Sequence, residues 1–503
     1  MGEMENVQKR SPIFTIQYEI DGWNMKKEKI TKKAGIQVKK IPSPSVLQTA
    51  AQEKKFITPK TACVLLFVFW IPIIMCCLPG NMMWDTGSGI SQFLKVDYVT
   101  PNNPYFLNFL FGSVVYIGQL LGNANIAVMI YCLLQSGITI FLLANGICGM
   151  GRINQYAGYF LLIFYGLVPV YSIYSMSMSK DSCLAAAVLL YVVLALQSFR
   201  EQDFWQNDRN TLMFSLSILL MTLTRNHSGW VPAIVFVLYS VFVLKQKNMI
   251  IKSTAVLLLV AFFALFLPAA LRIPPTESKE GMSIPLQTMA YYAKTHPEDM
   301  SEEDKAVISQ VLPYETMIES YDLRIADPIK NIANFNGENT GPFIRLWFQK
   351  LLRHPETMAE GFYKSTYIYV SPAEYCTVKL HVWIGYEIAN QGALGLSNNN
   401  PNRSTLRDYF NGWLETPVIH LFVKIGLFSI LLGVCILLMI IFKQGRYMLC
   451  IAPLLMIFIG CLLSPVNGYY RYAYPMIIGI PVLFADLLVT VVRQLKCSVS
   501  GKK

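Results

Sequence analysis

Polar and charged side chains gather in five short segments, each next to a long apolar run. The first segment is WDTGSGISQF, which contains Asp85 and, seven residues later, Gln92. A carboxylate can take a proton from a hydroxyl group, and cationic side chains, above all guanidinium groups, bind phosphate oxygens. The other four segments supply Asn103 before Pro104, Lys180 and Asp181 in SKDS, Arg225, Asn226 and His227 after Thr224, and Arg471 in NGYYRY. If these segments meet, they could form one site for acid–base chemistry on an anionic substrate.

Each of these residues also has a common structural interpretation. Asp85 could be a solvated loop acid, and Asp181 could cap a helix N-terminus. Arg225 and Arg471 could anchor helices at the membrane interface, and His227 could serve only as a hydrogen-bonding partner. The aromatic run around position 471 is typical of an interface belt, formed here by Tyr469, Tyr470, Tyr472 and Tyr474. No Cys or His spacing supports a metal site. The cofactor is unknown: a divalent metal remains an open alternative, but the sequence offers no ligand set for it.

The composition indicates that lipid, not water, surrounds much of the chain. Of the 503 residues 54% are hydrophobic and only 15% are charged, and the mean hydropathy is +0.41. These values exclude an ordinary soluble protein of this size. Residues 1–60 contain twelve Lys or Arg against six Asp or Glu. This segment is expected to be a disordered, basic cytoplasmic tail attracted to anionic membrane lipids, and no nucleic-acid-binding module accompanies it.

Ten apolar runs approach the length needed to cross a bilayer. They are residues 61–79, 123–145, 155–175, 182–199, 211–225, 229–244, 250–270, 417–442, 447–464 and 473–492. With the N-terminus inside, most basic residues of the connecting loops fall on the cytoplasmic side. The sequence therefore predicts an all-α, multi-pass protein of the cell membrane, with about ten transmembrane helices and both termini cytoplasmic.

The predicted organisation has five parts: a tail (1–60), an N-terminal transmembrane bundle (61–271) with a first outer loop (80–122), a large extracytoplasmic loop (272–416), C-terminal transmembrane helices (417–492) and a second basic tail (493–503). Residues 104–121 are apolar enough to span, but a crossing there would reverse the charge bias. They are expected to form an interfacial helix on the outer leaflet. The large loop should be mostly helical, because Ser301–Asp304 forms a capping-box pattern and Pro355 can open another helix.

In this order the motifs resemble those of the membrane glycosyltransferases of the GT-C fold. They resemble more closely a Firmicutes-type family of uncharacterised bacterial multi-pass proteins related to those enzymes. The resemblance rests on the acidic first outer loop, the SKDS turn, the RN turn at 225–226, the large outer loop and the late YRYAYP at 470–475. It covers most of the chain after residue 60. Related proteins carry His-His-Pro where this chain has Asn102-Asn103-Pro104, a departure that speaks against a metal-assisted mechanism.

The resemblance implies a GT-C-like bundle and transfer of a sugar from a polyprenyl-phosphate donor to a cell-envelope glycan or lipid. Asp85 is then the expected catalytic base. Arg471, Arg225 and Lys180 would bind the phosphate, and Gln92, Asn103, Asp181, Asn226 and His227 would complete the substrate-binding set. Two alternatives remain: a transporter or flippase of lipid-linked sugars, and a non-enzymatic membrane sensor or assembly protein. A transporter would concentrate its polar groups near the bilayer midplane, on broken helices.

Overall fold

The computed structural model describes residues 56–96, 103–225, 227–273, 278–374, 388, 391–397 and 400–500. The fold is all-α and about 78% helical, as expected from the composition. The predicted tail at 1–60 lies outside the described residues except for its last five positions. Asn226, which was expected in the site, also lies outside them.

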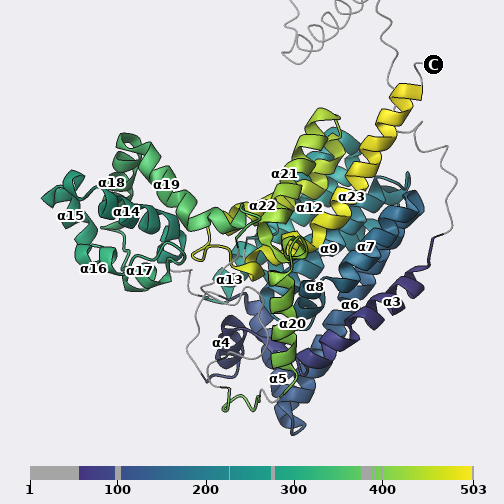
Figure 1. Cartoon of the computed structure of the whole chain (residues 1–503), viewed down its shortest axis with the longest axis horizontal. Coiled ribbons are helices and arrows are strands. Elements are labelled where there is room, and N and C mark those ends of the chain that lie inside the picture. Colours follow the sequence, from purple (N-terminus) through teal and green to yellow (C-terminus); the bar gives the residue numbers. More distant parts are fainter. Residues whose placement is uncertain are drawn as a thin grey trace, which may run out of the picture. The chain divides into compact units, whose positions relative to one another are not determined.

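The first half of the described chain forms a bundle of mostly long apolar helices (Figure 1). Its elements are α3 (Pro59–Cys77), β1 (Asn81–Met82), α4 (Trp84–Phe93), α5 (Tyr105–Leu120), α6 (Ala124–Ile153), α7 (Gln155–Leu167), α8 (Pro169–Ser175), β2 (Ser177–Met178), α9 (Lys180–Ser198), η1 (Phe204–Gln206), α10 (Asp208–Thr224), α11 (Trp230–Tyr239), η2 (Ser240–Leu244), α12 (Lys247–Ala261), η3 (Phe262–Phe266) and α13 (Leu267–Ala270). The last three helices return to the same bundle: α21 (Ile425–Ile441), α22 (Met448–Leu462, after η8, Gly445–Tyr447) and α23 (Tyr470–Ser500). One continuous hydrophobic core joins the two groups.

Among the described residues, six helices are long and apolar enough to cross a membrane: α3, α6, α9, α12 with its continuation to Ala270, α22 with η8, and α23. The pair α7 and α8 adds a seventh if it is one span broken by a bend of 62°. Helices α5, α11 with η2, and α21 are apolar but shorter. Each of the ten predicted runs coincides with helical segments, but ten crossings stay a prediction, as does the interfacial position of α5. The predicted run 417–442 begins as a helix only at Ile425, and α23 continues through the expected second tail to Ser500.

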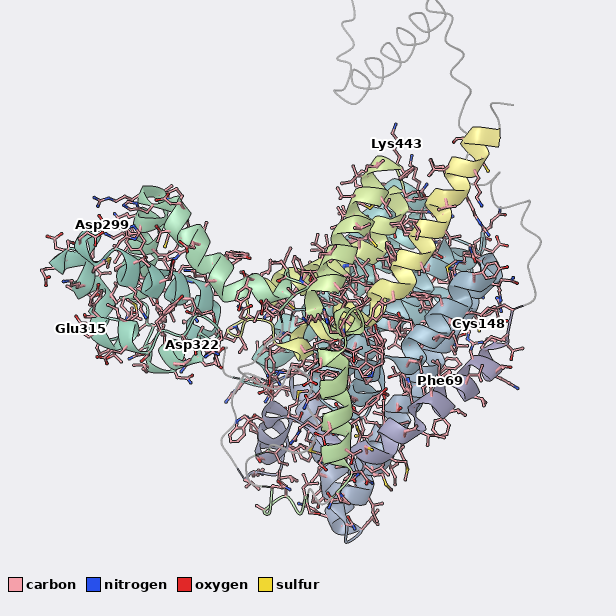
Figure 2. All side chains as sticks on the ribbon, in the orientation of Figure 1. Phe69, Cys148, Asp299, Glu315, Asp322 and Lys443 are labelled. Atoms are coloured by element: carbon pink, nitrogen blue, oxygen red, sulfur yellow. The ribbon has the colours of Figure 1, made fainter. Side chains whose placement is uncertain are left out.

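The helices between η4 and η6 have a hydrophobic core of their own. They are η4 (Ser278–Met282), α14 (Ser283–Thr295), η5 (Pro297–Asp299), α15 (Glu302–Ser309), α16 (Tyr314–Glu319), α17 (Asp327–Ile332), α18 (Thr340–Arg353), α19 (Pro355–Thr366) and η6 (Tyr367–Tyr369). We call this group the loop domain. Figure 2 shows Asp299, Glu315 and Asp322 on it, whereas the large exposed side chains of the bundle are mostly apolar. Helix α20 (Arg403–Glu415) and η7 (Ile419–Val423) then lead back to α21.

Local signals explain several boundaries of the loop domain. Helix α15 starts with the predicted capping box, in which Ser301 Oγ accepts from the Asp304 backbone N–H and Asp304 Oδ2 accepts from the Ser301 N–H. Helix α19 starts at Pro355, where a missing N–H costs nothing because the first turn has no partner for it. The helical content expected for residues 272–416 is therefore found in the described part of that range.

Contacts at the helix ends sort the bundle into two ends. Phe56, just before α3, packs on Gly151 and Gly158, where an added Cβ would come within 2.3 and 2.7 Å of its ring. Arg493 donates to the Ile153 carbonyl, and Arg200, just after α9, pairs with Asp486 in α23. The beginning of α3 and the ends of α6, α9 and α23 thus lie together. Lys180 at the beginning of α9 and Arg471 at the beginning of α23 therefore lie together at the opposite end of the bundle.

Candidate functional site

A small parallel sheet brings the segment that contains Asp85 to the start of α9. Asn81 pairs with Ser177 and Met82 with Met178 in the β1–β2 ladder, and Thr86 Oγ1 donates to the Met178 carbonyl at 2.8 Å. Helix α4 begins two residues after β1, and α9 begins two residues after β2. Because a ladder fixes the register of both strands, Asp85 and Lys180 are held opposite each other.

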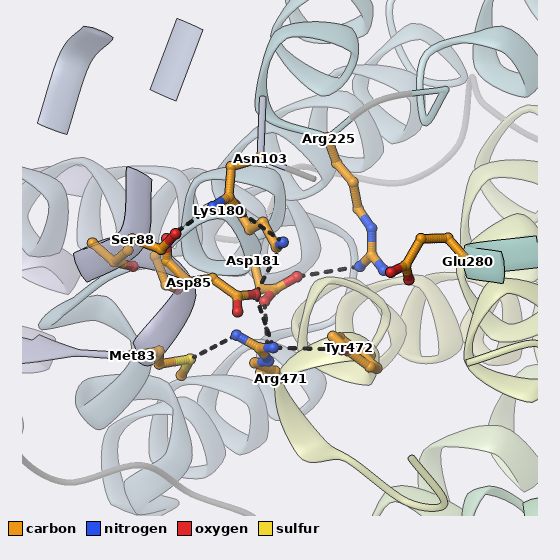
Figure 3. Close-up of polar contacts among 12 residues, drawn as sticks. Met83, Asp85, Ser88, Asn103, Lys180, Asp181, Arg225, Glu280, Arg471 and Tyr472 are labelled. Atoms are coloured by element: carbon orange, nitrogen blue, oxygen red, sulfur yellow. Dashed lines mark hydrogen bonds and ion pairs between the residues drawn. The ribbon is translucent and has the colours of Figure 1, made fainter. Parts of the chain in front are cut away.

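Asp85 lies between two cations from distant parts of the chain (Figure 3). Its Oδ2 atom lies 3.0 Å from Lys180 Nζ and 2.9 Å from Arg471 Nη2. The Asp85 side chain is 29% exposed, whereas that of Arg471 is 7% exposed. Burial raises the pKa of Asp85, but the two cations outweigh this effect and hold the pKa well below its usual range. Asp85 is therefore ionised at neutral pH and is a weak base in this arrangement.

The second carboxylate, Asp181, lies deeper and is 0% exposed. Arg225 Nη1 lies 3.2 Å from Asp181 Oδ1, and Arg471 Nε lies 3.8 Å from Asp181 Oδ2. The expected alternative role of Asp181 as an N-cap is wrong, because Ser179 caps α9 by accepting from the Ser182 N–H. A buried carboxylate needs a cationic partner, and Arg225 supplies one.

Aromatic rings and one sulfur surround the guanidinium of Arg471. Its Cζ atom lies 4.6 Å from the centre of the Tyr469 ring and 5.0 Å from that of Tyr472, and Nη1 lies 3.6 Å from Met83 Sδ. Tyr472 also faces Arg225, whose Cζ atom lies 5.2 Å from the same ring centre. Tyr470 and Tyr474 are 1% exposed, so these two do not form a lipid-facing interface belt. The aromatic run instead lines the charged cluster with Tyr469 and Tyr472 and fills the core with Tyr470 and Tyr474.

A pocket opens beside Asp85, between α4, α5 and the start of α9. It is small, with a volume of about 10 Å³, which is room for about one water molecule, and its lining contains two cations and one carboxylate. The lining residues are Asp85, Thr86, Asn103, Pro104, Leu107, Asn108, Phe111, Ser179, Lys180 and Arg471. Leu107 and Phe111 from α5 belong to the lining, but both are buried, at 2% and 4% exposed. The lining thus combines charged groups with apolar side chains, and a ligand larger than water would need these side chains to move apart.

Asn103 connects the two charged segments at the pocket. Its Nδ2 donates to the Asp85 carbonyl at 3.0 Å, and its Oδ1 accepts from Lys180 Nζ at 3.2 Å. Gln92 does not line the pocket: it donates to Ser88 Oγ at 3.1 Å and accepts from Asn108 Nδ2 at 3.4 Å. Gln92 therefore lies behind the pocket and bonds to Asn108, a lining residue that the sequence did not single out, and its contact with a substrate stays a prediction.

His227 does not join the site. It is exposed and its backbone has φ of +69°, in the left-handed region that non-glycine residues seldom adopt. Within the described residues, no group of three or more His, Cys, Asp or Glu side chains could hold a metal ion. Arg225 reaches the cluster through Asp181 but does not line the pocket. Figure 3 also shows the Glu280 carboxylate of η4 pointing toward Arg225, a neighbour that the sequence offered no means to identify.

The sequence profile of the family of unknown function DUF6020 matches residues 94–499. The chain belongs to the DUF6020 family. No curated protein and no solved structure matches it. The DUF6020 match contains Asn103, Lys180, Asp181, Arg225 and Arg471, whereas Asp85 precedes it by nine residues.

Proposed function

We propose that this DUF6020 protein is a membrane glycosyltransferase. In this proposal it moves a sugar from a polyprenyl-phosphate donor to a cell-envelope glycan or lipid at the outer face of the membrane. The observation that carries the proposal is the contact of Asp85 with both Lys180 and Arg471 at the mouth of one pocket. A proton acceptor beside two phosphate-binding cations is the minimum that such a transfer requires.

The two cations are the proposed phosphate ligands. Lys180 and Arg471 line the pocket together with Asp85, and Asp181 supplies a second carboxylate beside Arg471, so a phosphate would compete with these carboxylates for the two cations. A guanidinium can present two parallel N–H groups to a phosphate, and an ammonium adds a point charge. Arg471 Nε has no hydrogen-bond partner among the described residues, but it lies 3.8 Å from Asp181 Oδ2, so its ion pair with Asp181 also holds the guanidinium in place. Arg225 would not contact the phosphate and would act only through its ion pair with Asp181.

Phosphate binding would change the chemistry of Asp85. A phosphate that takes Lys180 and Arg471 removes the cations that depress the pKa of the Asp85 carboxyl. The pKa then rises toward the range in which a carboxylate accepts a proton efficiently. The base would therefore become active only when the donor is bound.

The transfer step follows from these positions. The acceptor hydroxyl gives its proton to Asp85, and its oxygen forms a bond to the anomeric carbon of the donor sugar. The bond from that carbon to the phosphate oxygen breaks, and the electron pair leaves with the polyprenyl phosphate. Lys180 and Arg471 stabilise the charge that develops on this leaving group. In this proposal Asn103, Asn108 and Ser179 would bind sugar hydroxyls, and the buried Leu107 and Phe111 would have to move to admit the lipid chain.

The proposal is tested with the full chain purified in detergent. A transfer assay would use polyprenyl-phosphate sugars extracted from the source cells, and mass spectrometry would follow the donor and the products. Wild-type protein should consume one donor species, and the Asp85→Asn variant should leave it intact. Asp208→Asn is the matched control. Asp208 also pairs with a lysine, but it begins α10, at the end of that helix away from Arg225, and its side chain is 87% exposed. Equal turnover by the Asp85→Asn variant and wild type would reject Asp85 as the base.

One feature favours a second function, a flippase for lipid-linked sugars. Helices α7 and α8 meet at a bend of 62°, and broken helices are common at transporter substrate sites. A flippase needs a sealed bilayer, whereas a transferase also acts in detergent. Sugar transfer in detergent therefore supports the enzyme, and lipid movement in vesicles without any transfer supports the flippase.

A further inference from the structure

Arg471 follows a segment that the loop domain holds through one asparagine, Asn467. The backbone N–H of Asn467 donates to the Arg324 carbonyl at 2.9 Å, and its Nδ2 donates to the Lys364 carbonyl at 3.1 Å. Its Oδ1 accepts from the Ile368 N–H at 3.1 Å. Asn467 is 1% exposed, so water does not compete for these bonds. Asn467 therefore binds three separate backbone positions of the loop domain, four residues before Arg471.

The same segment approaches the loop domain closely at Gly468. Its φ is +70°, and an added Cβ would lie 2.2 Å from Ile368 Cγ2. Tyr369 supports the next peptide groups, because its hydroxyl donates to the Val466 carbonyl at 2.9 Å and accepts from the Tyr469 N–H at 3.1 Å. The chain that leads into Arg471 is thus fixed on the loop domain by side chain and backbone together.

The segment that leads to Asp85 is held in a similar way from the start of α20. Arg403 Nη2 donates to the Gly80 carbonyl at 2.7 Å and also reaches the carbonyls of Leu78 and Cys77, at 3.3 and 3.4 Å. The Asn400 Nδ2 group lies 2.9 Å from the Leu78 carbonyl. The carbonyls at a helix C-terminus lack partners within the helix, and these side chains supply them. Arg403 is 6% exposed, and Gly80 lies five residues before Asp85.

We propose that Asn467 and Arg403 are positioning residues that hold the two backbones whose side chains meet as the Asp85–Arg471 ion pair. Asp85 and Arg471 come from opposite ends of the described chain, so no local structure sets their 2.9 Å contact. The contacts of Asn467 and of Arg403 connect the two segments that lead to Arg471 and Asp85 with the long region 272–416. The proposal rests on the proposed function only in that the pair is the reaction centre, and its consequence for the reaction is large. A displacement of about 1 Å at a reacting group costs about a hundredfold in rate.

The decisive measurement is the coupling between Asp85 and Arg471, which needs no substrate. Thermal unfolding of the full chain in detergent would be compared for wild type, Asp85→Asn, Arg471→Gln and the double variant. The pair should give a non-additive shift of about 2 °C in the unfolding temperature. If Arg471→Gln does not fold, Lys180→Gln replaces it in the Arg403 arm, because Lys180 contacts the same Asp85 oxygen. In the Asn467 arm Arg471→Met replaces it, because Lys180 does not lie on the segment that Asn467 holds.

The same cycle would then be repeated in the Arg403→Lys and Asn467→Ser backgrounds. Both substitutions keep a polar side chain but cannot make all the hydrogen bonds that Arg403 and Asn467 make to backbone groups. The Asp85–Arg471 coupling should therefore disappear. Arg407→Lys is the matched control, since Arg407 is exposed one turn further along α20, and the coupling should persist. A purely structural role would lower the unfolding temperature and leave the coupling intact, and that result would overturn the proposal. Failure of the glycosyltransferase assay alone would leave this outcome unaffected.

Discussion

Replacing Asp85 by asparagine should strengthen phosphate binding while it stops sugar transfer. Asparagine preserves the size of the side chain but carries no charge and accepts no proton at neutral pH. In the free protein the Asp85 carboxylate holds Lys180 and Arg471, which are the groups that a phosphate needs. The substitution therefore removes a competitor and a base in one step.

The size of the binding effect follows from the two contacts. A hydrogen bond between charged groups contributes about 1.5–3 kcal/mol. The Asp85 side chain is 29% exposed, so solvent screens the contacts and we take that range for both together. Release of the two cations should then tighten phosphate binding about tenfold to a hundredfold, since each 1.4 kcal/mol is a factor of about ten. Loss of a general base should lower turnover by about a hundredfold to ten-thousandfold.

Binding would be measured by titrating the purified full chain with farnesyl phosphate at one fixed salt concentration, and turnover by the transfer assay above. Asp208→Asn, with its distant and exposed carboxylate, should leave both quantities unchanged. Weaker or unchanged binding by the Asp85→Asn protein would refute the competition between Asp85 and the ligand. Near-normal transfer would refute its role as the base.

Four further predictions concern the same elements. Because folding lowers the pKa of Asp85, the stabilising effect of its carboxylate should persist above about pH 4 and fade below it. The difference in unfolding temperature between wild type and Asp85→Asn should therefore stay constant from pH 8 to pH 5. Arg471→Lys should retain part of the farnesyl phosphate affinity and Arg471→Ala very little, because a point charge replaces only part of a two-donor fork; equal affinities would contradict a phosphate contact. Gly468→Ala should lower the unfolding temperature by several degrees, because the added methyl group would strike Ile368 and the φ of Gly468 is +70°. An unchanged unfolding temperature would contradict this close approach. Deletion of residues 1–52 should leave the unfolding temperature unchanged, whereas deletion through Phe56 should lower it, because the Phe56 ring packs against Gly151; detergent-solubilised protein and size-exclusion chromatography would check both.

The membrane character and the helical segments could be predicted because both depend on local composition. A run of about twenty apolar residues is stable in lipid whatever its neighbours are, and caps such as Ser301 and Pro355 act within one turn. The number of crossings could not be predicted in the same way. Whether α5, α11 or α21 spans the bilayer depends on how the neighbouring helices place it. The bend between α7 and α8, in contrast, lies at Pro169, which the sequence shows inside the run 155–175.

Residue types along the chain also pointed to Asp85, Lys180, Asp181, Arg225 and Arg471, because charged groups next to apolar runs are costly unless they are paired or used. The sequence could not assign their partners. Asp181 as the partner of Arg225, and Asp85 as the shared partner of Lys180 and Arg471, follow from the β1–β2 register and from the packing of α9 on α23.

What the sequence determined by itself is thus a helical membrane protein with a set of costly charges at the ends of its apolar segments. What only the tertiary structure decided is which charges meet. Asn467 and Arg403 illustrate the difference, because residue type and spacing gave neither of them a role, although Asn467 opens the NGYYRY segment. Their importance comes from backbone groups tens to hundreds of residues away, and such contacts exist only after the chain has folded. Local chemistry is written in residue types, but the distances that make it a site depend on long-range packing.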